Sequence, residues 1–251
     1  MGEIRDSINF LGLRVDPLTM EETIAQCDLL IKMRNKQHVV INAAKVVTAS
    51  ESEELREIIN SCDLVNADGM AVVWASKLLR NPLPERVAGI DLMNNLVTHA
   101  VERNLRIYLL GAEEEVSMKV AEVFSQRGAS IVGRRNGFWT DAQETAVVSE
   151  ISKTNPDLLF IAVPSPKKEY FLKTHLLNLN CGLVVGVGGS FDVVAGKTRR
   201  APKFMQVTGM EWFYRLIQEP RRMLKRYAVG NSKFILLVFS ELLRRKKSAT
   251  K

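Results

Sequence analysis

The 251-residue sequence contains few cysteines and few histidines, three of each. Cys27, Cys62 and Cys181 are widely spaced, so they fit neither a zinc-binding motif nor a disulfide framework, and a reducing compartment is expected. The histidines are equally dispersed, which favours a hydrogen-bonded structural position for each over a catalytic or metal-binding one. No metal site is expected from these residues.

Long apolar runs are also missing. The segment from Met1 to Ser7 has no apolar core typical of a secretory signal, and Asp6 stands where a myristoylation motif needs Ser or Thr. The longest apolar run, from Phe234 to Phe239, is far shorter than the roughly 20 residues that span a bilayer. The sequence therefore predicts a protein that is soluble or attached to one membrane face, without crossing it.

Two common nucleotide-binding motifs are incomplete. Gly186-Val187-Gly188 begins like the dinucleotide fingerprint G-x-G-x-x-G, but Phe191 occupies the place of the third glycine. Residues 195–198 resemble the end of a P-loop, yet Phe191 also replaces its first glycine, so neither a hydride-transfer enzyme nor a P-loop NTPase is predicted. There is no D-x-D pair to hold a metal. We therefore expect no cofactor, and any diphosphate would be bound by helix N-termini, glycine-loop amides and cations.

Charge is distributed unevenly along the chain. Residues 197–251 carry 15 Lys/Arg and 3 Asp/Glu, a balance of +12, whereas the whole chain is +7, so residues 1–196 contribute −5. This asymmetry indicates a polyanionic partner, either nucleic acid or the anionic face of a membrane.

Short apolar runs alternate with helical patterns over the first 200 residues. Strands are expected at 38–42, 62–66, 106–110, 130–133, 157–163 and 183–187. Helices are expected near 51–60, 72–79 and after the acidic residues 113–115. Fully apolar strands separated by helices predict an α/β, Rossmann-like fold with a mainly parallel sheet and helices on both faces.

The alternation stops near Ala201-Pro202, which predicts a catalytic α/β domain over 1–202 and a basic helical appendage over 203–251. Three helical pieces are expected in the appendage: 208–218, a second from Pro220 to about 230, and a third capped by Ser232. The third piece is apolar and ends in four cations, at 244–247, which favours docking on an anionic leaflet. The alternatives are helices that pack on the body with solvated charges, or nucleic-acid binding, for which no recognisable fold is present.

Polar and glycine residues collect where the predicted strands end. They are Asn42, Asp68-Gly69, Gly111, 165–169 and 186–190. Ligands of open parallel sheets bind beyond these strand ends, so a polar cleft is predicted. Asp68 can accept a proton from a hydroxyl nucleophile there, or can merely form an Asx turn that starts the next helix.

Two further pairs of residues have both a functional and a structural interpretation. Arg86 and Asp91 form a charged pair in a proline-containing loop, which is either a ligand contact or an ordinary salt-bridged loop. Lys167 and Lys168 follow a predicted strand directly, so they either face phosphates or are solvated loop lysines.

Five segments, in order along nearly the whole chain, carry a family resemblance: 66–70 (NADGM), 82–91 (PLPERVAGID), 186–192 (GVGGSFD), 195–202 (AGKTRRAP) and 211–222 (EWFYRLIQEPRR). Together they resemble the WecG/TagA/CpsF family of bacterial glycosyltransferases, glycosyltransferase family 26. The resemblance implies inverting transfer of a sugar, often N-acetylmannosamine or its uronic acid, from a UDP-sugar to a polyprenyl-diphosphate-linked acceptor. It also implies peripheral attachment to the cytoplasmic face of the bacterial membrane, in cell-wall, teichoic acid, capsule or exopolysaccharide synthesis.

The family's motif aspartate, the general base, matches Asp68, and its strand-end asparagine matches Asn42. The basic appendage, for membrane and diphosphate binding, matches Arg215, Arg221, Arg222 and Arg226. One position departs from the family. Many members have G-x-P-K-Q-E where this chain has Pro164-Ser-Pro-Lys-Lys-Glu169, so Lys168 replaces a glutamine and the donor sugar stays open.

These arguments nominate Asp68 as the catalytic residue, with a larger set for substrate binding. The substrate-binding candidates are Asn42, Asn66, Arg86, Asp91, Gly111, Lys167, Lys168, Glu169, Gly188, Gly189, Asp192, Lys197, Arg199 and Arg200. The competing function from another class is a nucleotide-sugar or anionic-lipid binding module without turnover. Pairing of the apolar appendage with a second subunit is a further alternative.

Overall fold

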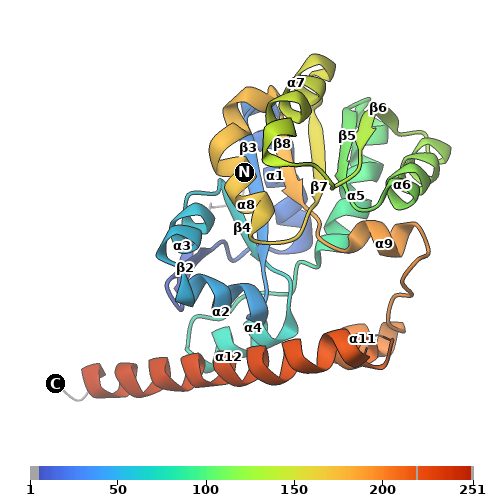
Figure 1. Cartoon of the computed structure of the whole chain (residues 1–251). Helices are drawn as coiled ribbons and strands as arrows, with labels where there is room; N and C mark the ends of the chain where they lie inside the picture. Colours follow the sequence, from blue (N-terminus) through green and yellow to red (C-terminus); the bar gives the residue numbers. More distant parts are fainter. Residues whose placement is uncertain (1–5, 219, 250–251) are drawn as a thin grey trace.

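A computed structural model describes residues 6–218 and 220–249, without the side chains of 221–223, 225–229 and 248–249 (Figure 1). Its centre is a six-stranded sheet with the order β4-β3-β8-β7-β5-β6, in which every neighbouring pair is parallel. The strands are β3 (Lys36–Ile41), β4 (Leu64–Ala67), β5 (Arg106–Gly111), β6 (Ser130–Arg135), β7 (Leu158–Ala162) and β8 (Leu183–Gly186). This confirms the predicted α/β fold with a mainly parallel sheet.

Helices cover both faces of the sheet. One face is covered by α1 (Met20–Met33), α5 (Gly89–Arg103), α6 (Glu114–Gln126) and α9 (Ser190–Val194). The other is covered by α2 (Ala43–Glu51), α3 (Glu53–Asn60), α4 (Met70–Leu78), α7 (Glu144–Thr154) and α8 (Lys167–His175). Short 3-10 turns, η1 (Asp141–Gln143) and η2 (Leu176–Leu179), adjoin α7 and α8.

Strand side chains fill a separate core on each face. In β7, Leu158 and Phe160 pack with α1, α5 and α6, whereas Leu159 and Ile161 pack with α7 and α8. All four are fully buried, which explains the unbroken apolar runs, because a two-sided sheet has no solvent face. Each such side chain stabilises the fold by roughly 1.5–3 kcal/mol.

The N-terminal hairpin and α2 are among the elements that were not predicted. A hairpin of β1 (Ile8–Phe10) and β2 (Leu13–Val15) turns at Leu11 and Gly12, both with positive φ, and buries Phe10 and Leu13 against α2 and α3. The helix α2 directly follows β3, and the side chain of Asn42 caps its N-terminus by accepting the Lys45 backbone N–H at 3.1 Å. Asn42 therefore has a structural role as the cap of α2, whether or not it also contacts a ligand.

The C-terminal region consists of α10 (Lys203–Val207), α11 (Glu211–Gln218) and α12 (Pro220–Ala249). The predicted break near 230–231 and the cap at Ser232 are wrong, because α12 is a single helix of 30 residues. A glycine inside a helix costs only about 1 kcal/mol, and burial of Phe234 and Val238 among the side chains of α2, α4 and β1 outweighs that cost. Within the described residues, no helix is both long and apolar enough to cross a bilayer.

Candidate active site

A cleft of about 1100 Å³ lies at the carboxyl ends of the parallel strands, closed on one side by α11 and α12. In Figure 1 these strand ends point towards the α9–α11 side of the molecule, where the C-terminal segment runs across beneath the sheet. Residues from five strand ends line it, among them Asn42, Asp68, Ala112, Ser165 and Gly186. The sequence therefore located the cleft correctly, since the carboxyl ends of parallel strands share one edge.

Asp68 lies in the wall of this cleft, directly after β4. The parallel register of β3 with β4 ends at Ile41 opposite Ala67, so the next residues, Asn42 and Asp68, come side by side. The Asp68 backbone N–H donates to the Ile41 carbonyl oxygen at 2.8 Å, and the Gly89 backbone N–H donates to its carboxylate. These contacts fix the direction of the side chain.

The carboxyl of Asp68 has a perturbed pKa. Burial raises the pKa to about 6, while the cationic side chains of Arg86 and Arg215 act in the opposite direction and Glu211 adds to the rise. Such a carboxylate is ionised at neutral pH and still basic enough to take a proton from a hydroxyl group. The arrangement suits a general base.

Ion pairs join Arg86 and the first turn of α5 to the C-terminal segment. Arg86 pairs with Glu211 of α11 at 2.5 Å, and Arg200 forms two hydrogen bonds of 2.6 Å to the carboxylate of Asp91. Arg200 also lies 3.8 Å from Glu211. The predicted pairing of Arg86 with Asp91 is therefore wrong, because each residue pairs with the C-terminal segment instead. These bonds hold α11 beside Asp68.

Of the predicted C-terminal cations, some face the cleft and others do not. Lys197, Arg200 and Arg215 line it, and Lys197 also lies 2.7 Å from Glu113. Arg199 is exposed outside the cleft lining, and its backbone N–H donates to Gln218. The side chains of Arg221, Arg222 and Arg226 lie outside the described residues.

Of the three glycines predicted to bind substrate, two line the cleft and one does not. Gly188 and Gly189 line the cleft together with Asp192, and Gly188 has a φ of 53°. Gly111 does not line it. Gly111 has a φ of 125°, and a Cβ there would lie 2.5 Å from the Ala162 backbone, so its glycine is explained by strand packing.

In the segment after β7, Lys167 lies at the surface, whereas Lys168 and Glu169 are buried. Lys167 donates to the Trp139 carbonyl at 3.1 Å and lies 4.5 Å from the centre of its ring, outside the cleft lining. Lys168 lines the cleft, and Glu169 is buried behind it. Asn66 is also buried, with its Oδ1 at 3.1 Å from His38 Nε2, and it does not line the cleft. Lys167 and Asn66 are thus tied into structural contacts.

Several residues that line the cleft were not singled out from the sequence. They are Lys45, Thr48, Phe138, Glu211 and Lys233. Lys45 could have been predicted from the sequence, because it follows the strand-end residue Asn42 by three positions. A cation in the first turn of a helix that starts at a strand end lies near the ligand edge of the sheet. Phe138 lies in a loop without a motif, and 71% of it is exposed at the cleft edge.

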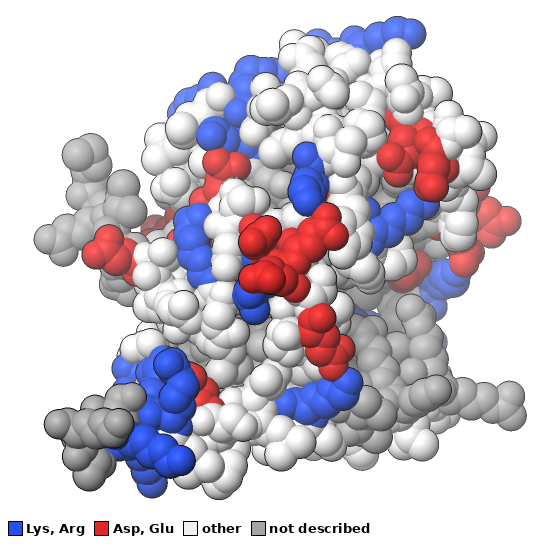
Figure 2. All heavy atoms as spheres, turned by 60° about the vertical axis from the view of Figure 1, so that its left-hand side comes forward, with Lys and Arg blue, Asp and Glu red and all other residues white. Residues whose placement is uncertain are grey.

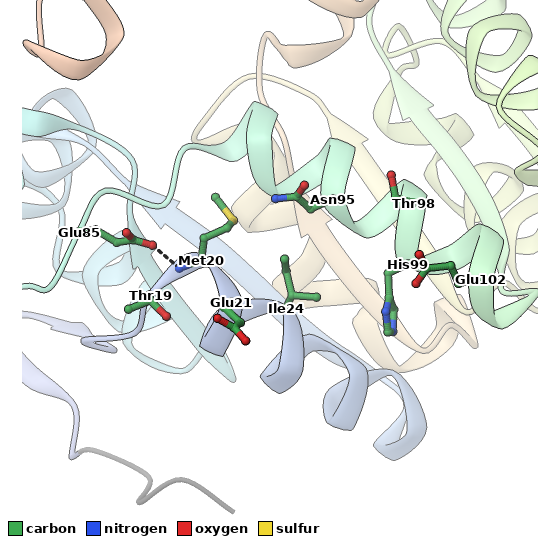
Figure 3. Close-up of a pocket in the computed structure, with 9 residues that line it drawn as sticks. All are labelled: Thr19, Met20, Glu21, Ile24, Glu85, Asn95, Thr98, His99 and Glu102. Atoms are coloured by element: carbon green, nitrogen blue, oxygen red, sulfur yellow. Dashed lines mark hydrogen bonds between the residues drawn. The ribbon is translucent and has the colours of Figure 1, made fainter. Parts of the chain in front are cut away.

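A second, shallower pocket of about 620 Å³ lies between α1 and α5 (Figure 3). Its lining includes three carboxylates, Glu21, Glu85 and Glu102, and Figure 3 shows Glu85 accepting the backbone N–H of Met20 at the start of α1. His99, also in the lining, is held by Asp28 at 2.8 Å. The acidic lining does not suit a diphosphate.

All three histidines have side-chain partners: His38 contacts Asn66, His99 contacts Asp28, and His175 contacts Glu144. Among the residues that the structure describes, no group of three or more His, Cys, Asp or Glu side chains is placed to hold a metal ion. Cys27, Cys62 and Cys181 are buried thiols whose pKa is raised to about 12 by burial.

The family model for the glycosyl transferase WecG/TagA/CpsF family matches residues 8–248. Since the match covers almost the whole chain, the protein belongs to this family. It is therefore a glycosyltransferase, of a family that acts in cell-wall polysaccharide synthesis.

Proposed function

We propose that the protein transfers a sugar from a UDP-sugar to a hydroxyl group of a polyprenyl-diphosphate-linked sugar, with inversion at the anomeric carbon. The observation that carries the proposal is Asp68, a carboxylate with a pKa of about 6 in the wall of the strand-end cleft. Membership of the glycosyltransferase family supplies the reaction class.

In the proposed step, a carboxylate oxygen of Asp68 takes the proton of the acceptor hydroxyl. The acceptor oxygen forms a bond to the anomeric carbon from the face opposite UDP. The bond between that carbon and the diphosphate oxygen breaks, and its electron pair leaves with UDP. A single displacement of this kind inverts the anomeric configuration.

The cations around the cleft would stabilise the charge that develops on the leaving diphosphate. Lys197, Arg200 and Arg215 all line the cleft, and Gly188 and Gly189 line it as well. Fixed cations and amides can stabilise a leaving group without a metal ion, which agrees with the absence of a D-x-D pair from the sequence.

The outward side of α12 supports peripheral attachment to the membrane. Ile235, Phe239 and Leu243 recur every four residues, so they form one exposed apolar stripe, and Leu236 lies beside them. Trp74 and Leu78 of α4 are exposed apolar side chains as well. Figure 2 shows Lys and Arg gathered at the lower left, at the end of α12, where Arg244–Lys247 lie. Apolar side chains flanked by cations suit an anionic leaflet, here the inner face of the cell membrane.

The decisive variant is Asp68→Asn, which keeps the shape of the side chain but removes the base. UDP release in the presence of a UDP-sugar and a short-chain polyprenyl-diphosphate-linked sugar should fall by about 100- to 10,000-fold, while UDP binding stays within about twofold. Turnover near the wild-type rate would remove Asp68 from the role. Wild-type protein that binds the donor yet never releases UDP would instead support the binding module without turnover.

A further inference from the structure

One face of α2 and the middle of α12 form a side arm of the cleft. The two helices lie side by side (Figure 1), and Lys233 of α12 pairs with Glu51 at the end of α2, with 2.5 Å between Nζ and Oε1. Ala44, Thr48 and Glu51 recur at intervals of three or four residues, so they share one face of α2, and all three line the cleft. Gly230 and Lys233 line it from α12. These five residues define the α2–α12 groove.

Gly230 keeps this groove open. Helical spacing puts residues 230, 234 and 238 on one side of α12, and Phe234 and Val238 are buried in the body from that side. At Gly230, one turn earlier, an added Cβ would meet none of the described atoms within 4 Å. A glycine inside a helix is unfavourable relative to alanine, because it loses more conformational freedom on folding. The glycine therefore weakens the helix and leaves the space in front of it free.

The groove and the glycine loop lie on opposite faces of the sheet. The strands β3 and β8 are neighbours, but α2, which follows β3, packs on one face, whereas α9, which follows β8, packs on the other. Ligands of parallel sheets bind where the chain leaves neighbouring strands in this way. Gly188, Gly189, Lys197 and Arg200 all follow β8 and line the cleft. A diphosphate bound by these residues therefore leaves the α2–α12 groove free for another substrate.

Inversion requires the two substrates to approach from opposite sides. The acceptor hydroxyl attacks the anomeric carbon from the face opposite the leaving UDP, so the acceptor and UDP lie on opposite sides of that carbon. The helix α2 begins after Asn42, which lies beside Asp68, and ends at Glu51. At 1.5 Å per residue, the groove leads away from the base over roughly 13 Å. Its position and direction suit the acceptor.

We propose that the α2–α12 groove binds the first sugar of the acceptor and turns one of its hydroxyl groups towards Asp68. The inference rests on the proposed function, in which the acceptor is a lipid-linked sugar. The Thr48 hydroxyl donates to the Ala44 carbonyl oxygen at 3.0 Å and can still accept from a sugar hydroxyl. Glu51 and Lys233 are each about half exposed, so they present an acceptor and donors to the groove. Their charges cancel, which suits an uncharged sugar better than a diphosphate.

The test measures the binding of two ligands by calorimetry: UDP, and N-acetylglucosamine linked to a short-chain prenyl diphosphate, titrated into UDP-saturated protein. Gly230→Leu fills the groove, so it should weaken acceptor binding by about 10- to 100-fold and leave UDP binding within about twofold. Gly230→Ala should weaken acceptor binding less, and should raise the melting temperature by about 2–4 °C because alanine favours the helix. A more stable protein that binds the acceptor less tightly excludes misfolding as the cause.

Two further variants separate the groove from the rest of the helices. Thr48→Val removes the hydroxyl with little change in shape, and should weaken acceptor binding by about 2- to 10-fold. Ser240→Leu is the matched control for Gly230→Leu, because it adds the same side chain to α12 at an exposed position outside the cleft lining. It should leave both affinities unchanged.

Weakened UDP binding in Gly230→Leu would assign the groove to the donor and overturn the inference. Unchanged affinities for both ligands in this variant, or no binding of the acceptor to the wild-type protein, would overturn it as well. Transfer is measured separately, as UDP release from UDP-N-acetylmannosamine in the presence of the same acceptor. If the wild-type protein binds the acceptor in the groove but releases no UDP, the proposed function fails while the binding site stands.

Discussion

Asp68 is a residue on which burial and neighbouring charge act in opposite directions. Burial alone would favour the protonated acid, whereas Arg86 and Arg215 favour the carboxylate, and the resulting pKa is about 6. Because Arg215 is supplied by α11, the basicity of Asp68 depends on how the C-terminal segment is seated. The ion pairs of Arg86 and Arg200 with Glu211 and Asp91 hold that segment in place.

The pH dependence of transfer follows from this pKa. The rate should rise between about pH 5 and pH 7 with a midpoint near 6, because only the ionised carboxylate can accept the proton. Removing a cation by Arg86→Gln should move the midpoint upwards, since Arg86 lowers the pKa of Asp68. Initial rates of UDP release at subsaturating donor, measured across this range, check both statements. A rate of UDP release that does not change between about pH 5 and pH 7 would contradict them.

Asp68 should also make the protein less stable at neutral pH. Its folded-state pKa lies above the value of 3.8 expected in the unfolded chain, so its contribution to stability is full below pH 3.8 and is lost as pH rises through about 6. At pH 7.5 the cost is at most about 3 kcal/mol. Asp68→Asn should therefore raise the melting temperature at pH 7.5, and this gain should shrink towards pH 4. Equal melting curves of the two proteins at pH 7.5 would contradict the shift.

At the residue scale, the sequence predicted which residues lie at the cleft better than it predicted their contacts and pKa values. Asp68 could be nominated because it separates a predicted strand from a glycine, but its pKa depends on Arg215, 147 positions later in the chain. Lys167 and Lys168 look equivalent in the sequence. Only the start of α8 at Lys167 turns one towards Trp139 and the other into the cleft.

At the scale of elements, α12 has apolar side chains on two sides with different environments. Phe234 is 5% exposed and packs within the body, whereas Phe239 is 57% exposed on the outer side. The sequence pattern contains both but does not distinguish them. The strands could be predicted because each is a short apolar run, while the course of α12 depends on contacts with α2 and α4.

These two phenylalanines form a matched pair for a stability measurement. Phe234→Ala should lower the free energy of unfolding by about 3–5 kcal/mol, because it leaves a cavity in the core shared with Phe10. Phe239→Ala should change it by less than about 0.5 kcal/mol, since the ring packs against little. Denaturant unfolding of both variants provides the comparison. Similar losses would mean that α12 does not pack as described.

At the scale of the whole molecule, the chain separates a slightly acidic body from a basic, apolar C-terminal region. The predicted division into 1–202 and 203–251 remains a prediction, and burial of Phe234 and Val238 shows that α12 shares the body's core. Removing the residues after Asn231 would therefore disturb the fold as well as any membrane contact. A sharper test changes only the outer stripe.

The double variant Ile235→Ser/Phe239→Ser should keep the fold and lose attachment to anionic vesicles. Both side chains are exposed, so their loss removes apolar contact with the leaflet without opening a cavity in the core. Flotation with phosphatidylglycerol-containing vesicles measures attachment, and Ser240→Ala on the same helix serves as the control. Attachment of wild-type protein should also weaken with added salt, because the cations contribute through screened charge. Unchanged flotation of the double variant would exclude this stripe as the contact.

The thickness of α12 has a consequence for the acceptor. Gly230 and Lys233 line the cleft, while Ile235 and Phe239 lie on the exposed side of the same helix. If that side rests on a leaflet, the cleft and the lipid are separated by one helix diameter, about 10–12 Å. The diameter of the helix then sets the distance between the leaflet and the cleft. A carrier whose first sugar projects about this far presents its hydroxyl at the level of Asp68, whereas the end of a longer oligosaccharide overshoots it, so the enzyme would favour early, short intermediates.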